Sequence, residues 1–249
     1  MLEIRPLGGI PEVAPGDELA RMLADAYAAE QPMPGDILVV TQKIVSKAEG
    51  RLVSLAEVSP SLRAQDIATA TRKDPRLVEL VLAESSELIR AAPGVLIARH
   101  RSGHVMANAG IDGSNLGPVT GTHVLLLPED ADASARALAE GIALHIGFAP
   151  GIVISDSFGR PWRNGVVNVA IGCAGVPALT DLRGTPDRDG RVMQATLVAN
   201  ADLIASAAGL AMGEATEGMP AALVRGLVLH GPPTSASALL RPAAEDLFR

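Results

Sequence analysis

Short apolar runs typical of buried strands and longer stretches typical of helices follow one another along this chain without a strict strand–helix–strand order. The apolar runs lie at 36–41, 94–100, 103–110, 122–128, 151–156, 165–172 and 221–229. The helical patterns lie at 17–30, 59–73, 74–90, 130–147, 197–213 and 235–248. Because a doubly wound sheet needs regular alternation, this order favours an α+β fold with mixed sheets.

The core of such a fold must consist mainly of aliphatic side chains. Hydrophobic residues make up 48% of the chain, but aromatic residues only 2%. The 249 residues suffice for one large domain, or for two small lobes, around a sizeable core. This profile is that of a globular protein rather than a disordered one.

The charge balance excludes some partners. With 21 basic and 28 acidic residues, the chain has a formal charge of −7, which argues against nonspecific binding to nucleic acid or to an anionic membrane. The first ten residues show no signal-peptide pattern, and no apolar run approaches the ~20 residues of a membrane-spanning helix. Cys173 is the only cysteine, so no intrachain disulfide can form. We therefore expect a cytoplasmic protein.

The first polar segment of chemical interest, "TQKIVSKAEGR", follows the apolar run 36–41. Only three of the 21 basic residues are lysines, and two of them, Lys43 and Lys47, lie here beside Gln42. An ammonium is a compact charge that approaches a single phosphate oxygen, and donors at a strand end commonly face a ligand cleft. We expect a strand-end loop at a ligand site; the alternative is a surface lysine pair.

The second segment is "NAGIDGSNLG", residues 108–117. Asp112, Ser114 and Asn115 offer a carboxylate, a hydroxyl and an amide within four residues. Oxygen donors of this kind suit Mg²⁺ or Mn²⁺, which complete their coordination with phosphate and water. The alternative is an ordinary Asp-Gly turn.

The third segment is "VISDSFGRPWRNG", residues 153–165. Asp156 and Ser157 end an apolar run, and Arg160 and Arg163 follow in a short loop. A carboxylate can hold a cation while arginines bind the phosphate or carboxylate that the cation also touches. The alternative is an internal Asp–Arg salt bridge.

Together these segments hold the groups of a metal-dependent phosphoryl-transfer site, which acts by positioning and by neutralising charge. Walker, HExxH, paired CxxC and GxSxG motifs are absent. A nucleotide site must therefore be built from other elements.

Five ordered motifs make the chain similar to a known family: "PLGGIPEV", "GDILVVTQKIVSKAEGR", "NAGIDGSN", "ISDSFGRPWRNGVVNVAIG" and "MGEATEGMPAALVRGL". The chain resembles the coenzyme F420-0:L-glutamate ligases over nearly its whole length. The resemblance implies a single ligase domain over residues 1–249, built from two interleaved subdomains. It does not extend to the nitroreductase-like domain that is fused to some members. The family fold is α+β, with two intertwined lobes and a homodimer.

The resemblance also implies a reaction. GTP, with Mg²⁺ or Mn²⁺ and K⁺, phosphorylates the terminal carboxylate of F420-0, and the amine of L-glutamate attacks the acyl phosphate to give an amide, GDP and phosphate. A second, γ-linked glutamate can follow. The partners are then small molecules: GTP, L-glutamate and F420-0.

The matched motifs also imply a role for each site residue. The predicted metal ligands are Asp112, Asp156, Ser157 and Glu214. The predicted nucleotide contacts are Ile10, Pro11, Glu12, Val13, Gln42, Lys43, Lys47, Asn115, Met212, Gly213, Glu214 and Gly218. The predicted catalytic groups are Lys47, Arg160 and Arg163; charge alone assigns the two arginines to phosphate or to the anionic substrate.

Two other functions would use the same groups. One is a different metal-dependent, nucleotide-using carboxylate–amine ligase or a phosphohydrolase, with another amine or water as the acceptor. The other is a nucleotide-binding module without turnover.

Overall fold

A five-stranded mixed sheet forms the centre of the computed structural model, which describes residues 1–246. Its strand order is β1-β12-β2-β8-β9. The strands are Glu3–Pro6 (β1), Ala221–Arg225 (β12), Ile37–Thr41 (β2), Gly151–Arg160 (β8) and Arg163–Ala174 (β9). Only β2 and β8 pair in parallel, with Thr41 opposite Ser155. The chain after Thr41 and residues 156–160 of β8, which pair only with β9, therefore extend from the same end of the two strands.

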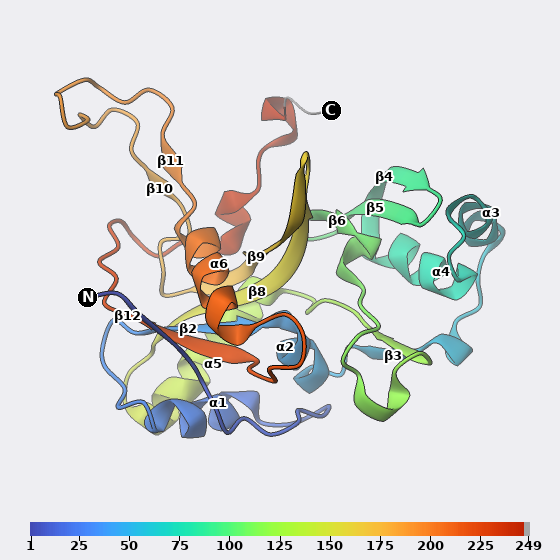
Figure 1. Cartoon of the computed structure of the whole chain (residues 1–249), viewed down its shortest axis with the longest axis horizontal. Coiled ribbons are helices and arrows are strands. Elements are labelled where there is room, and N and C mark those ends of the chain that lie inside the picture. The colour runs from blue at the N-terminus through green and yellow to red at the C-terminus, as the bar shows by residue number, and fades with distance from the viewer. Residues whose placement is uncertain (247–249) are drawn as a thin grey trace.

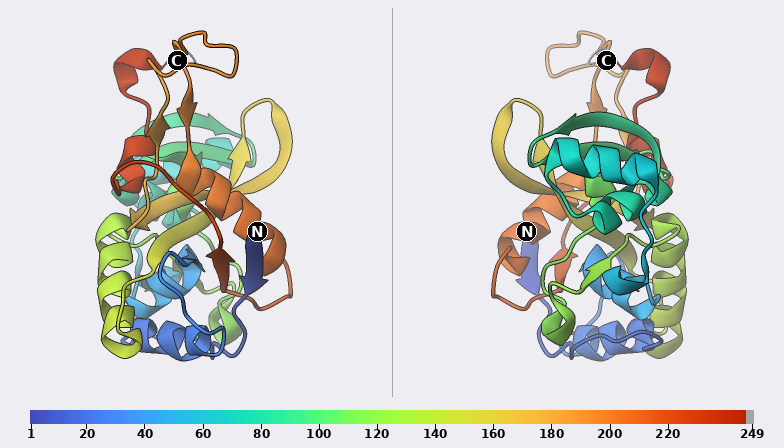
Figure 2. Two further views of the ribbon diagram at one scale, coloured as in Figure 1. Left: turned by 90° about the vertical axis from the view of Figure 1, so that its left-hand side faces the viewer. Right: turned by 90° about the vertical axis from the view of Figure 1, so that its right-hand side faces the viewer.

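Helices cover both faces of this sheet (Figures 1 and 2). Helices α1 (Leu19–Ala28) and α5 (Ala131–Ile146) pack on one face, and α6 (Asn200–Met212) packs on the other. Strand β2 is buried on both sides: Leu38 and Val40 face α1 and α5, and the alternate residues face α6. Strands covered on both faces appear as continuous apolar runs, as this one does.

A further core lies beside the central sheet, to the right in Figure 1. It contains α3 (Leu62–Thr71), α4 (Pro75–Glu84) and a three-stranded sheet. The strands of that sheet are Ser85–Ala92 (β4), Val95–His100 (β5) and Val105–Ala107 (β6).

The remaining elements are short. Two-stranded pairs are formed by Leu52–Ser54 (β3) with His123–Leu125 (β7), and by Thr180–Asp181 (β10) with Leu197–Val198 (β11). The β10–β11 arm projects from the body at the upper left of Figure 1. Helix α2 (Gln42–Ala48) follows β2 directly. Within residues 1–246 no helix is both long enough and apolar enough to cross a membrane.

The expected α+β fold with mixed sheets and helices is confirmed, whereas the two intertwined lobes and the homodimer stay predictions. The expected cap of α4 is also present: the Asp74 side chain accepts a hydrogen bond from the Arg76 amide, and Pro75 is the first helical residue. Several strands and helices are shorter than expected, and β1, β3, β10 and β11 were not expected from the sequence.

Two expectations in the first half of the chain were wrong. The segment after β2 is helix α2 rather than a loop, because Ile44 and Val45 turn into the main core and thereby stabilise this short helix. The helix expected over 74–90 ends at Glu84, and Ser85 begins β4. Pairing of β4 with β5 supplies backbone hydrogen bonds that outweigh the helical pattern of the last residues.

Two further expectations were wrong in the second half. Residues 156–163 form no short loop: β8 and β9 are long strands of one hairpin, in which Arg160 pairs with Arg163 next to the turn. The helix expected over 235–248 is replaced, within the described residues, by the 3₁₀ turns Ala236–Leu239 and Ala243–Glu245. Pro242 lacks an N–H group and disfavours helical geometry in the residue before it. The last two residues of that expected helix lie outside the described range.

A buried ion pair ties three parts of the fold together. Asp36, only 1% exposed, accepts hydrogen bonds from Arg225 Nε (2.7 Å) and Nη2 (2.6 Å), from the Tyr27 hydroxyl (2.7 Å) and from the Met33 amide (3.0 Å). Burial alone would raise the pKa of Asp36, but the hydrogen bonds from Arg225, Tyr27 and Met33 outweigh it and hold this pKa below its ordinary value. The pair joins α1 and the turn before β2 to strand β12.

Replacing Arg225 by methionine should lower the free energy of unfolding by about 3–5 kcal/mol at neutral pH, because it leaves a buried carboxylate without its cation. The measurement is chemical denaturation at equilibrium. Arg76→Met is the matched control: its pair with Asp74 is half exposed, so the change should cost less than about 1 kcal/mol.

The difference in the free energy of unfolding between wild type and Arg225→Met also depends on pH. Since the folded-state pKa of Asp36 lies below its unfolded value of about 4, the contribution of the pair is complete above that value. It is lost as the pH falls through the folded-state pKa. The stability difference between wild type and Arg225→Met should therefore shrink in acid, and a constant difference would contradict this role.

Candidate active site

Two cavities adjoin where the pairing of β2 with β8 ends, at Thr41 and Ser155. The smaller cavity has a volume of about 370 Å³, and the larger one about 890 Å³. Five residues line both cavities: Lys43, Asn115, Asp156, Ser157 and Glu214. This shared wall is where groups bound in the two cavities would meet.

The smaller cavity is built by three segments far apart in the sequence. They are the loop before α1, the solvent side of α2 and the loop between α6 and β12. Its lining from these segments is Ile10, Pro11, Glu12, Val13, Lys43, Ile44, Lys47, Met212, Gly213, Glu214, Ala215, Thr216, Glu217, Gly218, Met219 and Pro220. Helix α2 presents Lys43 and Lys47 here, four residues apart and thus on one helical face.

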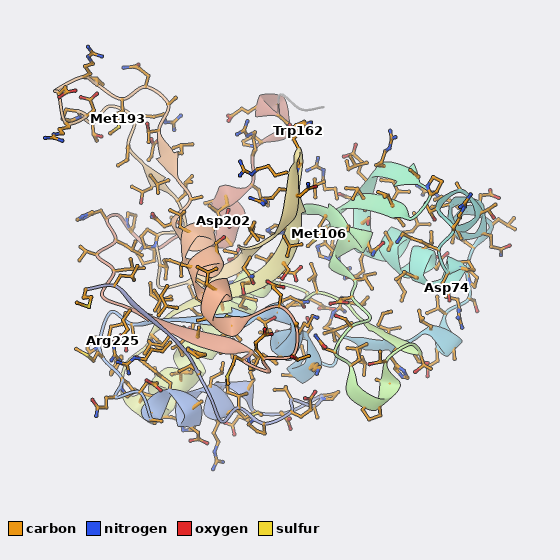
Figure 3. The ribbon with its side chains drawn as sticks, in the orientation of Figure 1. Asp74, Met106, Trp162, Met193, Asp202 and Arg225 are labelled. Atoms are coloured by element: carbon orange, nitrogen blue, oxygen red, sulfur yellow. The ribbon has the colours of Figure 1, made fainter. Side chains whose placement is uncertain are left out.

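The larger cavity lies between the β8–β9 hairpin and the chain around β6. Figure 3 shows Met106, on β6, beside the base of the hairpin, and Trp162 at its tip. Arg160 and Arg163 line this cavity and not the smaller one. Asp112 and Ser114 line it near the shared wall.

A compact network surrounds Asp112. Lys43 Nζ lies 2.7 Å from Asp112 Oδ2 and donates to Ser114 Oγ at 2.8 Å. The backbone amide and the hydroxyl of Ser114 donate to the same carboxylate at 2.8 and 2.9 Å. Burial alone would raise the pKa of Asp112, but Lys43 and Ser114 outweigh it and keep this pKa below its ordinary value. Asp112 is therefore an anion, with a cation already beside it.

Asp156 has the opposite electrostatic character. Burial raises the pKa of its carboxyl to about 7, and the charge of Asp112 adds to the rise. The Ser157 amide, the charge of Lys43 and the side chain of Gln42 offset it only in part. Gln42, the first residue of α2, is 1% exposed, and its Nε2 makes no hydrogen bond of ordinary geometry. Two neighbouring carboxylates that disfavour each other's charge form a place where a bound cation would be stabilised.

Glu214 reaches this wall from the loop after α6. Its carboxylate accepts a hydrogen bond from the Ser157 hydroxyl at 2.7 Å and another from the Asn168 amide. The sequence singled out Ser157 and Glu214 but missed Asn168, whose signal is a polar residue within the apolar run of β9. These contacts connect the hairpin to the loop that closes the smaller cavity.

Lys47 is mostly buried, with 14% of its side chain exposed, and pairs with Glu12, whose side chain is 81% exposed. An ion pair with such an exposed partner contributes little stability, so a stronger anion can displace Glu12. Lys47 is therefore available to a phosphate group in the smaller cavity.

The structure thus places most predicted nucleotide contacts on the smaller cavity. Gln42 is the exception, since it is buried behind the wall. Asp156, Ser157 and Glu214, three of the four predicted metal ligands, are on the shared wall, and the fourth, Asp112, lines only the larger cavity beside it.

The donor set fits a small divalent ion. All the donors are oxygen atoms, and Mg²⁺ typically takes one or two carboxylates and completes its coordination with phosphate and water. In the described part of the chain, no three side chains of the types His, Cys, Asp and Glu gather closely enough to hold a metal ion. Asp112 and Asp156, with Ser157 and Glu214, would therefore hold such an ion jointly with a bound substrate.

Comparison with known proteins gives the class and then the family. Residues 9–226 match the family model described as F420-0:Gamma-glutamyl ligase. The Coenzyme F420:L-glutamate ligase of Methanopyrus kandleri is 45% identical over 253 residues, which cover 100% of this chain and 98% of that protein. Proteins of the same name from Methanothermobacter thermautotrophicus and Haloarcula marismortui are 43% and 41% identical, over 97% and 100% of this chain and 96% of each relative.

These matches place the chain among the ligases that form amide bonds. More particularly, the chain belongs to the F420-0:gamma-glutamyl ligase family. The family resemblance read from the five motifs is thereby confirmed.

Replacing Asp156 by asparagine should weaken Mn²⁺ binding in the presence of GDP by at least about tenfold. Even residues that only hydrogen-bond to a metal ligand typically contribute this much to metal affinity. Electron paramagnetic resonance of free and bound Mn²⁺ measures this directly. Asp66→Asn, on the exposed face of α3, removes the same charge far from both cavities and should leave the affinity unchanged. Wild-type affinity in Asp156→Asn would refute the metal assignment.

Proposed function

We propose that this chain uses GTP to join the amine of L-glutamate to the terminal carboxylate of coenzyme F420-0. The observation that carries the proposal is the meeting of two cavities at the wall of Asp156, Ser157 and Glu214. A phosphate donor in the smaller cavity and an acceptor in the larger one would meet there. The names of the relatives, which are F420:L-glutamate ligases, support the choice of substrates.

The chemistry has two balanced steps. A carboxylate oxygen of F420-0 attacks the γ-phosphorus of GTP, the bond from that phosphorus to the β–γ bridging oxygen breaks, and GDP leaves. The amine of glutamate then attacks the carbonyl carbon of the acyl phosphate. Inorganic phosphate leaves, the amine nitrogen loses its proton, and an amide remains. The first step turns a poor electrophile into a reactive one. A second, γ-linked glutamate can be added by the same steps.

The residues of the shared wall have distinct roles in this proposal. Lys47 and Lys43 neutralise charge on the phosphates of GTP, which positioning and electrostatics must stabilise during phosphoryl transfer. Asp112, Asp156, Ser157 and Glu214 hold Mg²⁺ or Mn²⁺, which when bound supplies Lewis-acid stabilisation of the transferred phosphoryl group. The proposal includes K⁺ as a further cation, and a cytoplasmic homodimer, as the family resemblance implies.

The test of this function is a product analysis. Purified protein with GTP, Mn²⁺, L-glutamate and F420-0 should form a species heavier by one glutamyl residue, together with GDP. Omission of either glutamate or F420-0 should abolish the glutamylated product. GTP turnover that continues at the same rate without either substrate would instead indicate a phosphohydrolase.

Lys47→Met should raise the KM for GTP by about 10- to 100-fold, the range expected for losing a hydrogen bond between charged groups. Lys73→Met is the matched control, because Lys73 follows α3 and lines neither cavity. Its kinetics should equal those of the wild type. An unchanged KM and turnover in Lys47→Met would reject a phosphate contact for this lysine.

A further inference from the structure

Arg160 and Arg163 lie apart from the phosphate-binding lysines. Both line the larger cavity, and neither lines the smaller one that contains Lys47. Within residues 1–246 neither guanidinium forms an ion pair, although seven other arginines do. The two ends of the larger cavity therefore carry opposite charges. Carboxylates gather at the shared wall, and two cations without an ion-pair partner lie at the hairpin end.

The hairpin itself binds one of these cations near its turn. Arg160 Nη2 donates a hydrogen bond at 3.0 Å to the carbonyl of Asn164, on the strand that leaves the turn. A side chain at Gly165 would approach Nη2 to 3.9 Å, so the guanidinium lies across the paired strand near the turn. Arg160 Nε is buried without a partner. The Arg160 guanidinium thus lies against the β9 side of the hairpin, close to its turn.

Distance along β8 separates the two ends of the cavity. Asp156 and Arg160 are four residues apart in one strand, which corresponds to about 13 Å. Free glutamate spans only about 6 Å from its amine to its distal carboxylate, five bonds away. The cavity that these residues line has a volume of about 890 Å³ and therefore accommodates a molecule much larger than free glutamate.

The wall between these ends is apolar. It is formed by Val105, Met106, Phe158 and Val166, from β6 on one side and from the hairpin on the other. His104 packs against Phe158 edge to face, with ring centroids 6.1 Å apart, and thereby orients this aromatic ring. Such a slot suits a flat ring system.

We propose that Arg160 and Arg163 bind the ring system of the acceptor F420-0, a deazaflavin coenzyme, at the end remote from the carboxylate that reacts. The ring lies between β6 and the hairpin, and the guanidinium groups donate hydrogen bonds to its oxygen atoms. The two arginines thereby select a large acceptor and make no contact with the phosphates of GTP. This inference rests on the proposed function and replaces the assignment of these arginines from charge alone, which left phosphate or substrate open.

The test measures the KM values for GTP, glutamate and F420-0, and then replaces F420-0 by a truncated acceptor. Arg160→Gln and Arg163→Gln should each raise the KM for F420-0 by about 10- to 100-fold, the range for a charge-assisted hydrogen bond. The KM values for GTP and for glutamate should change less than about twofold. With a truncated acceptor that keeps the reacting carboxylate but lacks the ring, the difference between wild type and each variant should fall below about twofold.

Arg21→Gln, on the exposed side of α1, is the matched control and should behave as the wild type with both acceptors. Arg163 is itself exposed, so its variant keeps the test independent of any folding defect in Arg160→Gln. A raised KM for GTP or glutamate, or an equal loss with the truncated acceptor, would overturn the inference. A wild-type protein that forms no glutamylated product would instead refute the proposed function.

Discussion

The parallel pairing of β2 with β8, within an otherwise antiparallel central sheet, is the constraint on which the site depends. Parallel strands end at the same edge, so α2 and the start of the hairpin arm leave the sheet side by side. Burial on both faces, against α1 and α5 on one side and α6 on the other, holds these two strands rigidly. The lysines of α2 and the carboxylate of Asp156 are thus positioned by the most buried part of the molecule, as a preorganised site requires.

Electrostatics then divides the site into regions of different character. Asp112 remains an anion because Lys43 and Ser114 stabilise its charge, whereas burial and the charge of Asp112 raise the pKa of Asp156 to about 7. Lys47 faces an exposed and replaceable partner. The arginines lie at the far end of the larger cavity. A metal bound with phosphate would relieve the repulsion between the carboxylates, so the nucleotide and the metal favour each other's binding in the proposed function.

Local patterns predicted the interior of the fold well and its connections less well. Apolar runs such as 36–41 and 151–156 are strands because burial on both faces leaves no room for polar residues. The segments 74–90 and 235–248 were misjudged for different reasons: strand pairing with β5 overrode one helical pattern, and Pro242 interrupted the other. The chemistry of the site was more visible, since Asp112, Asp156 and Lys47 stand in polar segments of the sequence. Asn168 was missed because it stands alone within an apolar run.

The sequence by itself determined the kinds of group available: oxygen donors at 112, 156 and 157, an isolated pair of lysines, two arginines and the ordered motifs of one ligase family. Only the tertiary structure decided how these groups are distributed. Arg160 is four residues from Asp156 in sequence, and the short loop expected there left its ligand open between phosphate and the anionic substrate. An extended hairpin carries it to the other end of a separate cavity. The reason is that residues 156–160 form a strand because β9 pairs with them, whereas their polar and glycine-containing composition by itself favours a loop.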